Sequence, residues 1–191
     1  MIGLELEIWP GVFHPKYFGS TSILANFVSS LPLRGRTFLE IGCGSGVVAM
    51  CAARAGAKVT AVDINPDAVR CTKANAERNK LIVTTSTSDV FSSIAPGRFD
   101  VIAWNPPFLQ GEPDSFAGAA FFGGKDLDVI RRFIREARSY LEVDGAIYTI
   151  LSSDVAIGRI EQLFGNEGFT VSRVREAPWR FGEMMVILCA R

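Results

Sequence analysis

The sequence predicts an α/β fold built on a mainly parallel sheet. Segments with the apolar pattern of strands alternate with segments of helical periodicity along most of the 191 residues. This alternation is typical of parallel sheets whose strands are joined by helices. A glycine-rich loop at 42–46 lies between a predicted strand and a predicted helix. The last two predicted strands have no helix between them, and their short link at 176–182 favours an antiparallel hairpin.

The strand predictions rest on short apolar or alternating segments. Near the N-terminus, the apolar residues Ile2, Leu4, Leu6 and Ile8 alternate with Gly or Glu. The segment 81–85 is the weakest strand of the set. In chain order, the predicted strands are 2–8, 37–41, 58–62, 81–85, 99–104, 146–151, 169–175 and 184–190.

The helix boundaries follow from capping and helix-breaking residues. A Ser or Thr near the first helix can start it, and Pro32 follows its end. Gly56 ends the second helix, and the first turn of the third contains Pro66 and Asp67. Residues 11–19 and 109–125 are predicted loops, the second of them over a site. In chain order, the predicted helices are 20–31, 47–55, 66–78, 126–141 and 155–165.

Bulk composition indicates one globular domain. The formal net charge is zero, which argues against a large autonomous nucleic-acid footprint because such proteins are usually strongly basic. The start of the chain has no basic segment that would suggest a signal peptide, and no apolar stretch reaches membrane-spanning length. No C-x-x-C pair occurs, so we expect no metal and predict reduced, buried thiols in a cytoplasmic protein. The cysteines are Cys43, Cys51, Cys71 and Cys189.

The glycine loop is a candidate ligand site. Its glycines allow a tight turn and close approach of a ligand to the backbone, and the following helix N-terminus favours a negative group. Val47 stands where a dinucleotide fingerprint needs its last glycine. Asp63 ends the next strand, where a ribose-binding acid is expected. A purely structural turn, with Asp63 as a helix N-cap, is the alternative.

The segment Asn105-Pro106-Pro107-Phe108 ends the strand at 99–104. Two prolines cannot lie inside a central strand, because each lacks a ladder donor. The Asn105 side-chain oxygen and the Pro106 carbonyl could together accept both N–H bonds of a planar NH2 group and stabilise its developing charge. The ring of Phe108 could stack on a planar substrate. The alternative is a buried turn with a core phenylalanine.

These motifs resemble those of class I S-adenosylmethionine-dependent methyltransferases. Ser88-Asp89-Val90-Phe91 is similar to their adenine-binding segment. The resemblance implies a Rossmann-like, seven-stranded, mostly parallel sheet with an antiparallel last strand and helices on both faces. It also implies that Glu40 lies near the methionine amine, Asp63 at the ribose and Asp89 at the adenine amine. The implied cofactor-binding residues are Thr21, Glu40, Gly42, Gly44, Gly46, Asp63, Ile64, Asp89, Val90 and Asn105.

The Asn-Pro-Pro-Phe segment narrows the resemblance to enzymes that methylate amide or exocyclic nitrogens. The stretches 74–79 and 123–127 are similar to the HemK-like protein-glutamine group, and 11–15 with 20–22 is similar to the segment that closes over the cofactor. This implies a single methyltransferase domain over 1–191, with 1–35 as an N-terminal lid and 36–191 as the catalytic core. The catalytic residues it implies are Asn105, Pro106 and Phe108.

The methyl acceptor stays open at this point. A protein glutamine, as in release factors, is marginally ahead of adenine in RNA or DNA because of the neutral charge, and a small molecule is a third option. Only 41 residues precede the glycine loop, so we expect no helical substrate domain of the bacterial glutamine enzymes. The substrate would then be held by 1–22, by 109–125 or by an activating partner subunit. Phe108 replaces the commoner Tyr. The sequence predicts no oligomeric state.

Two other classes of function remain as alternatives. One is a catalytically silent cofactor-binding scaffold subunit, and the other is a nicotinamide-dependent oxidoreductase, which Val47 disfavours. His14 is interpreted as a loop packing residue, and Trp9 and Trp179 as core in preference to a substrate rim. Three arginines on one helix face are interpreted as a solvated face, namely Arg131, Arg135 and Arg138.

Overall fold

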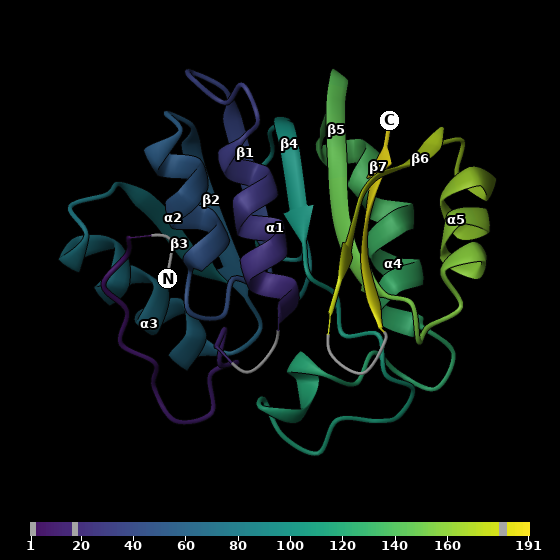
Figure 1. The fold of residues 1–191 in the computed structure, drawn as a ribbon, viewed down its shortest axis with the longest axis horizontal. Coiled ribbons are helices and arrows are strands. Elements are labelled where there is room, and N and C mark those ends of the chain that lie inside the picture. The colour runs from purple at the N-terminus through teal and green to yellow at the C-terminus, as the bar shows by residue number, and fades with distance from the viewer. Residues whose placement is uncertain (1–2, 17–18, 180–182) are drawn as a thin grey trace.

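A seven-stranded sheet forms the centre of the molecule (Figure 1). The computed structural model describes residues 3–16, 19–179 and 183–191. The strand order is β3-β2-β1-β4-β5-β7-β6. The strands are β1 (Thr37–Ile41), β2 (Lys58–Asp63), β3 (Val83–Thr87), β4 (Phe99–Trp104), β5 (Leu141–Ser152), β6 (Val171–Pro178) and β7 (Met184–Ala190).

The sheet has the predicted mixture of strand directions. β1 pairs in parallel with β2 and with β4, β2 pairs in parallel with β3, and β4 pairs in parallel with β5. β7 is antiparallel to both β5 and β6. The carboxyl ends of the parallel strands therefore meet at one edge, where loops gather below the sheet in Figure 1. The N-terminal segment and the loop at 109–125 lie at that edge.

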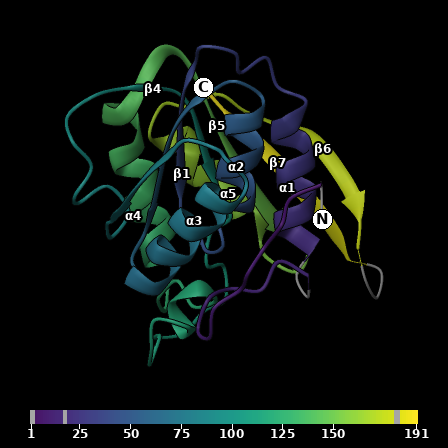
Figure 2. The ribbon, with the colours of Figure 1, turned by 90° about the vertical axis from the view of Figure 1, so that its left-hand side faces the viewer.

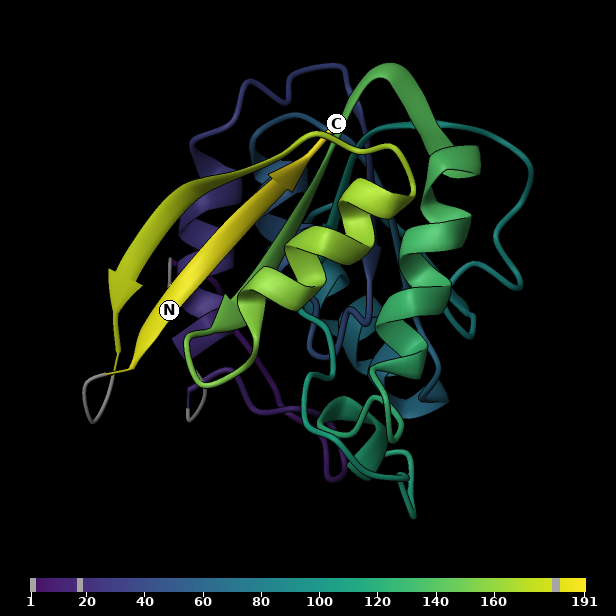
Figure 3. The ribbon, with the colours of Figure 1, turned by 90° about the vertical axis from the view of Figure 1, so that its right-hand side faces the viewer.

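Helices cover both faces of the sheet, as predicted, with α1 and α4 on opposite sides in Figure 2 and α4 and α5 on the same side in Figure 3. One apolar core lies under α1 and α2 and contains Phe38 and Ile150. The other lies under α4 and α5 and contains Ile102, Phe133 and Phe164. The helices are α1 (Gly19–Ser29), α2 (Val47–Arg54), α3 (Pro66–Arg78), α4 (Asp128–Ala137) and α5 (Ile157–Asn166), with 3-10 turns at Gly118–Ala120 and Arg138–Tyr140.

Several predicted boundaries move. β3 begins two residues later than expected, α4 is shorter than 126–141, and β5 begins at Leu141 instead of 146. The helix at 126–141 starts late because Leu127 has a positive φ of 58°. A 3-10 turn then ends the helix and leads straight into β5. Parts of three predicted segments lie outside the described residues, namely Ile2 of the first strand, 17–18 of the first loop and 180–182 of the hairpin link.

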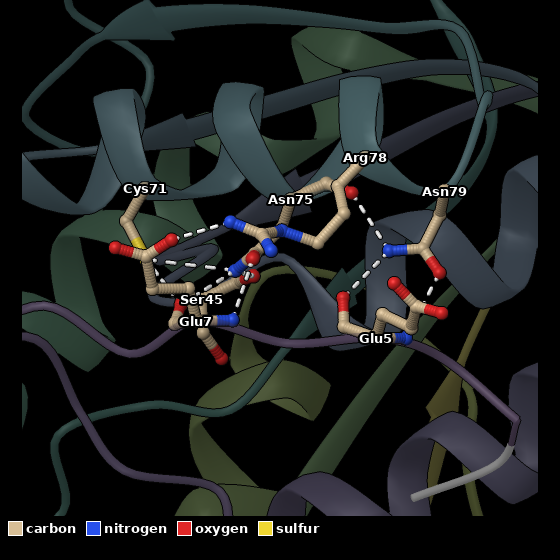
Figure 4. A network of polar contacts seen from close by, with 7 residues as sticks. All are labelled: Glu5, Glu7, Ser45, Cys71, Asn75, Arg78 and Asn79. Carbon is tan, nitrogen blue, oxygen red and sulfur yellow. Dashed lines mark hydrogen bonds and ion pairs between the residues drawn. The ribbon is translucent and has the colours of Figure 1, made fainter.

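The predicted N-terminal strand is wrong, because residues 4–8 pair with no strand. Their backbone bonds instead to two asparagine side chains of the third helix region, as Figure 4 shows. Asn75 Oδ1 accepts from Glu7 N at 2.9 Å, and Asn75 Nδ2 donates to Glu7 O at 3.0 Å. Asn79 makes the same pair of bonds with Glu5, at 3.0 and 2.8 Å. The alternating segment is thus extended, but side-chain amides replace a neighbouring strand.

The described part of the chain has neither a membrane-spanning helix nor a cluster of metal-ligating side chains. No helix there is long and apolar enough to cross a lipid bilayer. No group of three or more His, Cys, Asp or Glu side chains there is placed to hold a metal ion. The cysteines at 43, 51, 71 and 189 are all buried and unbridged.

Candidate functional site

Three cavities adjoin one another where the parallel strands end. We name them the glycine-loop cavity, the Asp89 cavity and the Asn105 cavity after residues in their walls. Gly42, Ile64 and Pro107 line both of the first two. Asn105 and Phe13 line both the glycine-loop cavity and the Asn105 cavity. The shared walls make the three cavities neighbours, and we call them together the cleft. Asn105 lies in the wall common to the glycine-loop cavity and the Asn105 cavity.

The glycine loop has the backbone that its residues require. Gly42, Gly44 and Gly46 have φ values of 66°, 53° and 80°, in the left-handed region that glycine tolerates. A Cβ on Gly46 would lie 2.7 Å from Cγ2 of Thr72. The Thr72 hydroxyl in turn donates to Gly44 O at 3.0 Å. The loop is therefore fixed both by its own φ angles and by α3.

Asp63 closes the loop from the end of β2. Its Oδ2 accepts from Gly44 N and its Oδ1 from Asn65 N, both at 2.9 Å. The N-cap of α3 is Asn65, whose side chain accepts from Asp67 N, so the alternative assignment of Asp63 as that N-cap is wrong. Burial raises the pKa of Asp63, although the backbone N–H groups oppose the rise.

Glu40, at the end of β1, is a second carboxyl group in the glycine-loop cavity. It is 5% exposed, and its Oε2 accepts from Ala49 N in the first turn of α2 at 2.7 Å. Burial raises the pKa of Glu40 well above its usual value, the Ala49 N–H lowers it, and the nearby Asp63 raises it further. Two carboxyl groups in one partly closed cavity make it suitable for a ligand with positive charge.

The Asp89 cavity has an apolar slot with a charged end. Val90 and Ile64 line it, and Val90 has a φ of 52°, which is unusual for a β-branched residue. Asp89 accepts two hydrogen bonds from the guanidinium of Arg132 on α4. Arg132 was not among the residues expected from the sequence, because its pairing with Asp89 spans 43 positions. This combination of apolar and charged lining residues suits a ring with polar edge groups.

The Asn105 cavity has a volume of about 250 Å³. Pro106 and Phe108 line it beside Asn105, as the sequence predicts for one strand end. Asn105 Nδ2 donates to Ser20 Oγ at 3.1 Å. Ser20 lines this cavity and the adjacent Thr21 lines the glycine-loop cavity, so the start of α1 contributes to both.

The Asn105 cavity has further wall residues between β6 and β7. Trp179 lies against Gly19, where an added Cβ would come within 2.3 Å of its ring. Trp179 also packs on the core under α1, so it is both core and cavity wall. Glu183 follows on the same hairpin and lines the cavity too. The sequence left a substrate rim as the alternative for Trp179 and did not single out Glu183, because no local pattern relates either residue to 19–20.

The minor candidates have other positions. His14 Nδ1 accepts from Lys16 N within the N-terminal loop, and Trp9 packs beside Val12 and α3. Arg131 pairs with Asp126. Arg138 lies in the 3-10 turn after α4, where it donates to Gly168 O and stacks over Phe169.

Comparisons with known proteins identify relatives over nearly the whole chain. The sequence model described as "Methyltransferase small domain" matches residues 4–173. A Methanocaldococcus jannaschii protein named "Putative protein N5-glutamine methyltransferase" is 35% identical over 195 residues, which cover 97% of this chain and 94% of that protein. The ribosomal RNA small subunit methyltransferase C of Chromohalobacter salexigens is 32% identical over 88% of this chain. The chain spans only 48% of the length of that relative.

Solved structures agree on the fold. The T. thermophilus 16S rRNA N2 G1207 methyltransferase, in complex with AdoMet and guanosine, matches with a TM-score of 0.75 and 25% identity. The match covers 96% of this chain and 46% of that one. The E. cuniculi Mtq2–Trm112 complex, described as acting in the methylation of the eRF1 translation termination factor, matches with a TM-score of 0.74 and 18% identity. That match covers 95% of this chain and 98% of the other.

Proposed function

This chain belongs to the methyltransferase small domain family and is an S-adenosylmethionine-dependent methyltransferase, and we propose that its methyl acceptor is the side-chain amide of a protein glutamine. The observation that carries the proposal is the position of Asn105. Its side chain lines both the glycine-loop cavity and the cavity beyond it. A group held at that junction lies between a cofactor site and a substrate site.

The proposal assigns the glycine-loop cavity and the Asp89 cavity to the cofactor. When bound, S-adenosylmethionine supplies a methyl group attached to a sulfonium. Glu40 and Asp63 would ionise opposite its cationic groups, because a nearby positive charge lowers the pKa values that burial raises. The left-handed glycines leave the backbone open to close approach. Ile64 and Val90 would flank the adenine, and Asp89 would lie at its amino edge. Thr21, at the first turn of α1, would complete the wall.

The acceptor chemistry rests on Asn105 and Pro106. Because Asn105 Nδ2 already donates to Ser20 Oγ, the Oδ1 atom stays available as an acceptor. Together with the Pro106 carbonyl, it would accept hydrogen bonds from both N–H groups of a planar NH2 group, fix its nitrogen facing the methyl group and stabilise the positive charge that develops there. The nitrogen becomes acidic once it is alkylated, so a proton can leave to solvent without a strong base. Phe108 offers its ring to the plane of the substrate.

Sequence similarity favours a protein substrate. The M. jannaschii protein is 35% identical over 97% of this chain, whereas the ribosomal RNA relative is 32% identical over 88% of it. The zero net charge also disfavours an extended nucleic-acid contact. A nucleobase NH2 group in RNA is the second candidate, favoured by the 32% identity to the ribosomal RNA enzyme and by the ring of Phe108. A scaffold without activity would have no need of the Asn105 and Pro106 acceptors.

The proposal also covers domain organisation, cellular location and a partner subunit. We assign 1–35 as a lid and 36–191 as the catalytic core of one domain, because Phe13 and Thr21 line the cleft of the core. Four unbridged, buried cysteines suit a reducing compartment such as the cytoplasm. A partner subunit is part of the proposal because the Mtq2 structure of similar fold was solved with Trm112. The partner would hold the substrate against the described loop at 109–125.

Calorimetric titration followed by methyl transfer tests the function. We expect micromolar binding of S-adenosylmethionine and S-adenosylhomocysteine, and transfer of a labelled methyl group to a glutamine peptide but not to ribosomal RNA. Asn105→Ala should abolish transfer and leave cofactor binding intact. Transfer to RNA alone would refute the glutamine assignment, and a fully active Asn105→Ala variant would refute the role of Asn105.

A further inference from the structure

The Asn105 cavity does not end at Phe108. A second cavity of about 300 Å³ lies beside it, and we name it the Arg159 cavity. It adds residues from the start of α5, with Ala156 and Ile160 in its wall together with Leu127. The residues that line both cavities are Phe108, Leu109, Asp154 and Val155.

Phe108 and Leu109, which line both cavities, are held in place. Leu109 N donates to Phe121 O at 2.9 Å, and Gly123 N donates to Leu109 O at 3.0 Å. The ring of Phe108 packs against the apolar core under α4 and α5. Leu109 keeps 44% of its surface exposed. A substrate that occupies both cavities would therefore lie across Phe108 and Leu109, which are held in place.

The charges along this path are predominantly negative. Asp154 lines both cavities, and Glu183 lines the Asn105 cavity. Burial raises the pKa of Glu183, and the nearby charge of Asp154 raises it further. Among the described residues that line the two cavities, Arg159 is the one cation. Its guanidinium is occupied by Asp126.

We infer, on the basis of the proposed function, that the two cavities form one groove for an extended polypeptide. The glutamine side chain enters the Asn105 cavity, and the side chain of a flanking residue enters the Arg159 cavity. In an extended segment, side chains two positions apart point the same way about 7 Å apart, which is enough to straddle an aromatic ring. Asp154 disfavours an acidic flanking residue and repels a phosphodiester backbone.

The first test fills the Arg159 cavity with a larger side chain. Ala156 is exposed and lies at the N-cap of α5, so Ala156→Phe should fold and block the Arg159 cavity. The substrates are N-acetylglutaminamide and the blocked peptide Leu-Ala-Gln-Ala-Leu. For each enzyme we compare kcat/KM for the peptide with kcat/KM for the small amide. We expect this ratio to be about tenfold lower in Ala156→Phe than in wild type, because the peptide can no longer bury one apolar side chain. Gln162→Phe, at an exposed position on the same helix that lines neither cavity, should leave the ratio unchanged.

The second test varies charge. Blocked peptides of the form X-Ala-Gln-Ala-X, with Arg, Ala or Glu at both X positions, bind the wild type in the presence of S-adenosylhomocysteine. We expect the dissociation constant to be about fivefold larger for Glu than for Ala or Arg, and Asp154→Asn to reduce that difference. Because binding is measured without turnover, the groove is tested even if chemistry is slow.

The outcomes separate the two proposals. Methylation of the peptide by wild type with an unchanged ratio in Ala156→Phe would overturn the groove and leave the glutamine assignment standing. Equal binding of all three peptides would do the same. Absence of peptide binding and methylation, together with methyl transfer to ribosomal RNA, would overturn the glutamine assignment and the groove with it.

Discussion

The side-chain amide of Asn105 donates to the hydroxyl of Ser20 at 3.1 Å, between residues 85 positions apart. Ser20 is 5% exposed at the start of α1, and Asn105 follows β4. An unrestrained asparagine amide can turn over and exchange its oxygen for its nitrogen. The bond to Ser20 favours the orientation in which the Asn105 oxygen is left for another donor.

Removal of that bond should reduce turnover without loss of the cofactor. We expect Ser20→Ala to lower kcat about tenfold, which corresponds to a hydrogen bond of about 1.4 kcal/mol. The dissociation constant of S-adenosylmethionine should stay unchanged, and Ser20→Thr should restore part of kcat because it keeps the hydroxyl. Steady-state kinetics and calorimetry measure the two quantities. Equal losses in kcat and in cofactor binding for both variants would indicate only a disturbed helix.

Glu40 gives a prediction about pH. Because burial raises its pKa in the folded state, the folded protein holds a proton that the unfolded chain has released. The stabilisation is complete below the usual glutamate pKa and is lost as pH rises through the folded-state pKa. Glu40→Gln removes this loss. Its free energy of unfolding relative to wild type should therefore be higher at pH 8 than at pH 5, by urea denaturation.

The same substitution should weaken cofactor binding. A cationic ligand in the glycine-loop cavity favours ionisation of Glu40. Gln cannot ionise, so we expect the dissociation constant of S-adenosylmethionine to rise at least about tenfold. A Glu40→Gln variant that is more stable at high pH yet binds the cofactor as well as wild type would contradict the proposed contact of Glu40 with the cofactor. The prediction about the pH dependence of stability would still be confirmed.

Gly46→Ala should destabilise the protein. It places a Cβ 2.7 Å from Cγ2 of Thr72 at a φ of 80°, and we expect a loss of about 2 kcal/mol from strain and overpacking. Gly165→Ala is the matched control, since its Cβ would meet nothing within 4 Å and α5 is helical there. The control should gain about 0.5–1 kcal/mol from helix propensity. Chemical denaturation measures both, and equal effects would show that the loop tolerates a side chain.

Asn75→Asp should release the N-terminal segment. The new carboxylate can still accept from Glu7 N, but it would face the carbonyls of Glu7 and Ser45, to which Asn75 Nδ2 donates at 3.0 Å. With Asn75 only 1% exposed, we expect a loss of about 3 kcal/mol in unfolding free energy. Faster proteolysis near residues 3–16 should accompany the loss. An unchanged cleavage rate would argue that other contacts hold this segment.

Most of the sheet could be predicted because its strands carry local signals. β1, β4 and β7 have the predicted bounds, since continuous apolar stretches bounded by Gly, Pro or a short link have few alternatives. β3 is an edge strand with partly exposed Val and Thr residues, so its hydrophobic pattern is weak and its start was misplaced. The N-terminal alternation satisfied the strand period, but its hydrogen-bond partners are side chains that no local pattern specifies.

The site divides along the same line. Glu40 and Asp63 lie at the ends of recognisable strands and Asn105 directly follows one, and parallel pairing brings such ends together. Ser20, Trp179 and Arg132 reach the cleft only through tertiary packing, with Arg132 paired across 43 positions. Sequence periodicity describes which face of an element is apolar, but not which distant side chain meets it.

One asparagine touches both the segment that leads to Phe13 and the loop that carries the glycines. Asn75 holds Glu7 on one side and Ser45 O on the other. Whatever orders the loop must therefore also order the N-terminal segment, and thermodynamic linkage makes the effect reciprocal. Amide-exchange protection at residues 5–7 should therefore rise as ligand occupies the cleft. The free energy by which the ligand stabilises this segment equals the free energy by which the docked segment favours ligand binding. The docked segment would then act as a built-in reporter of saturation.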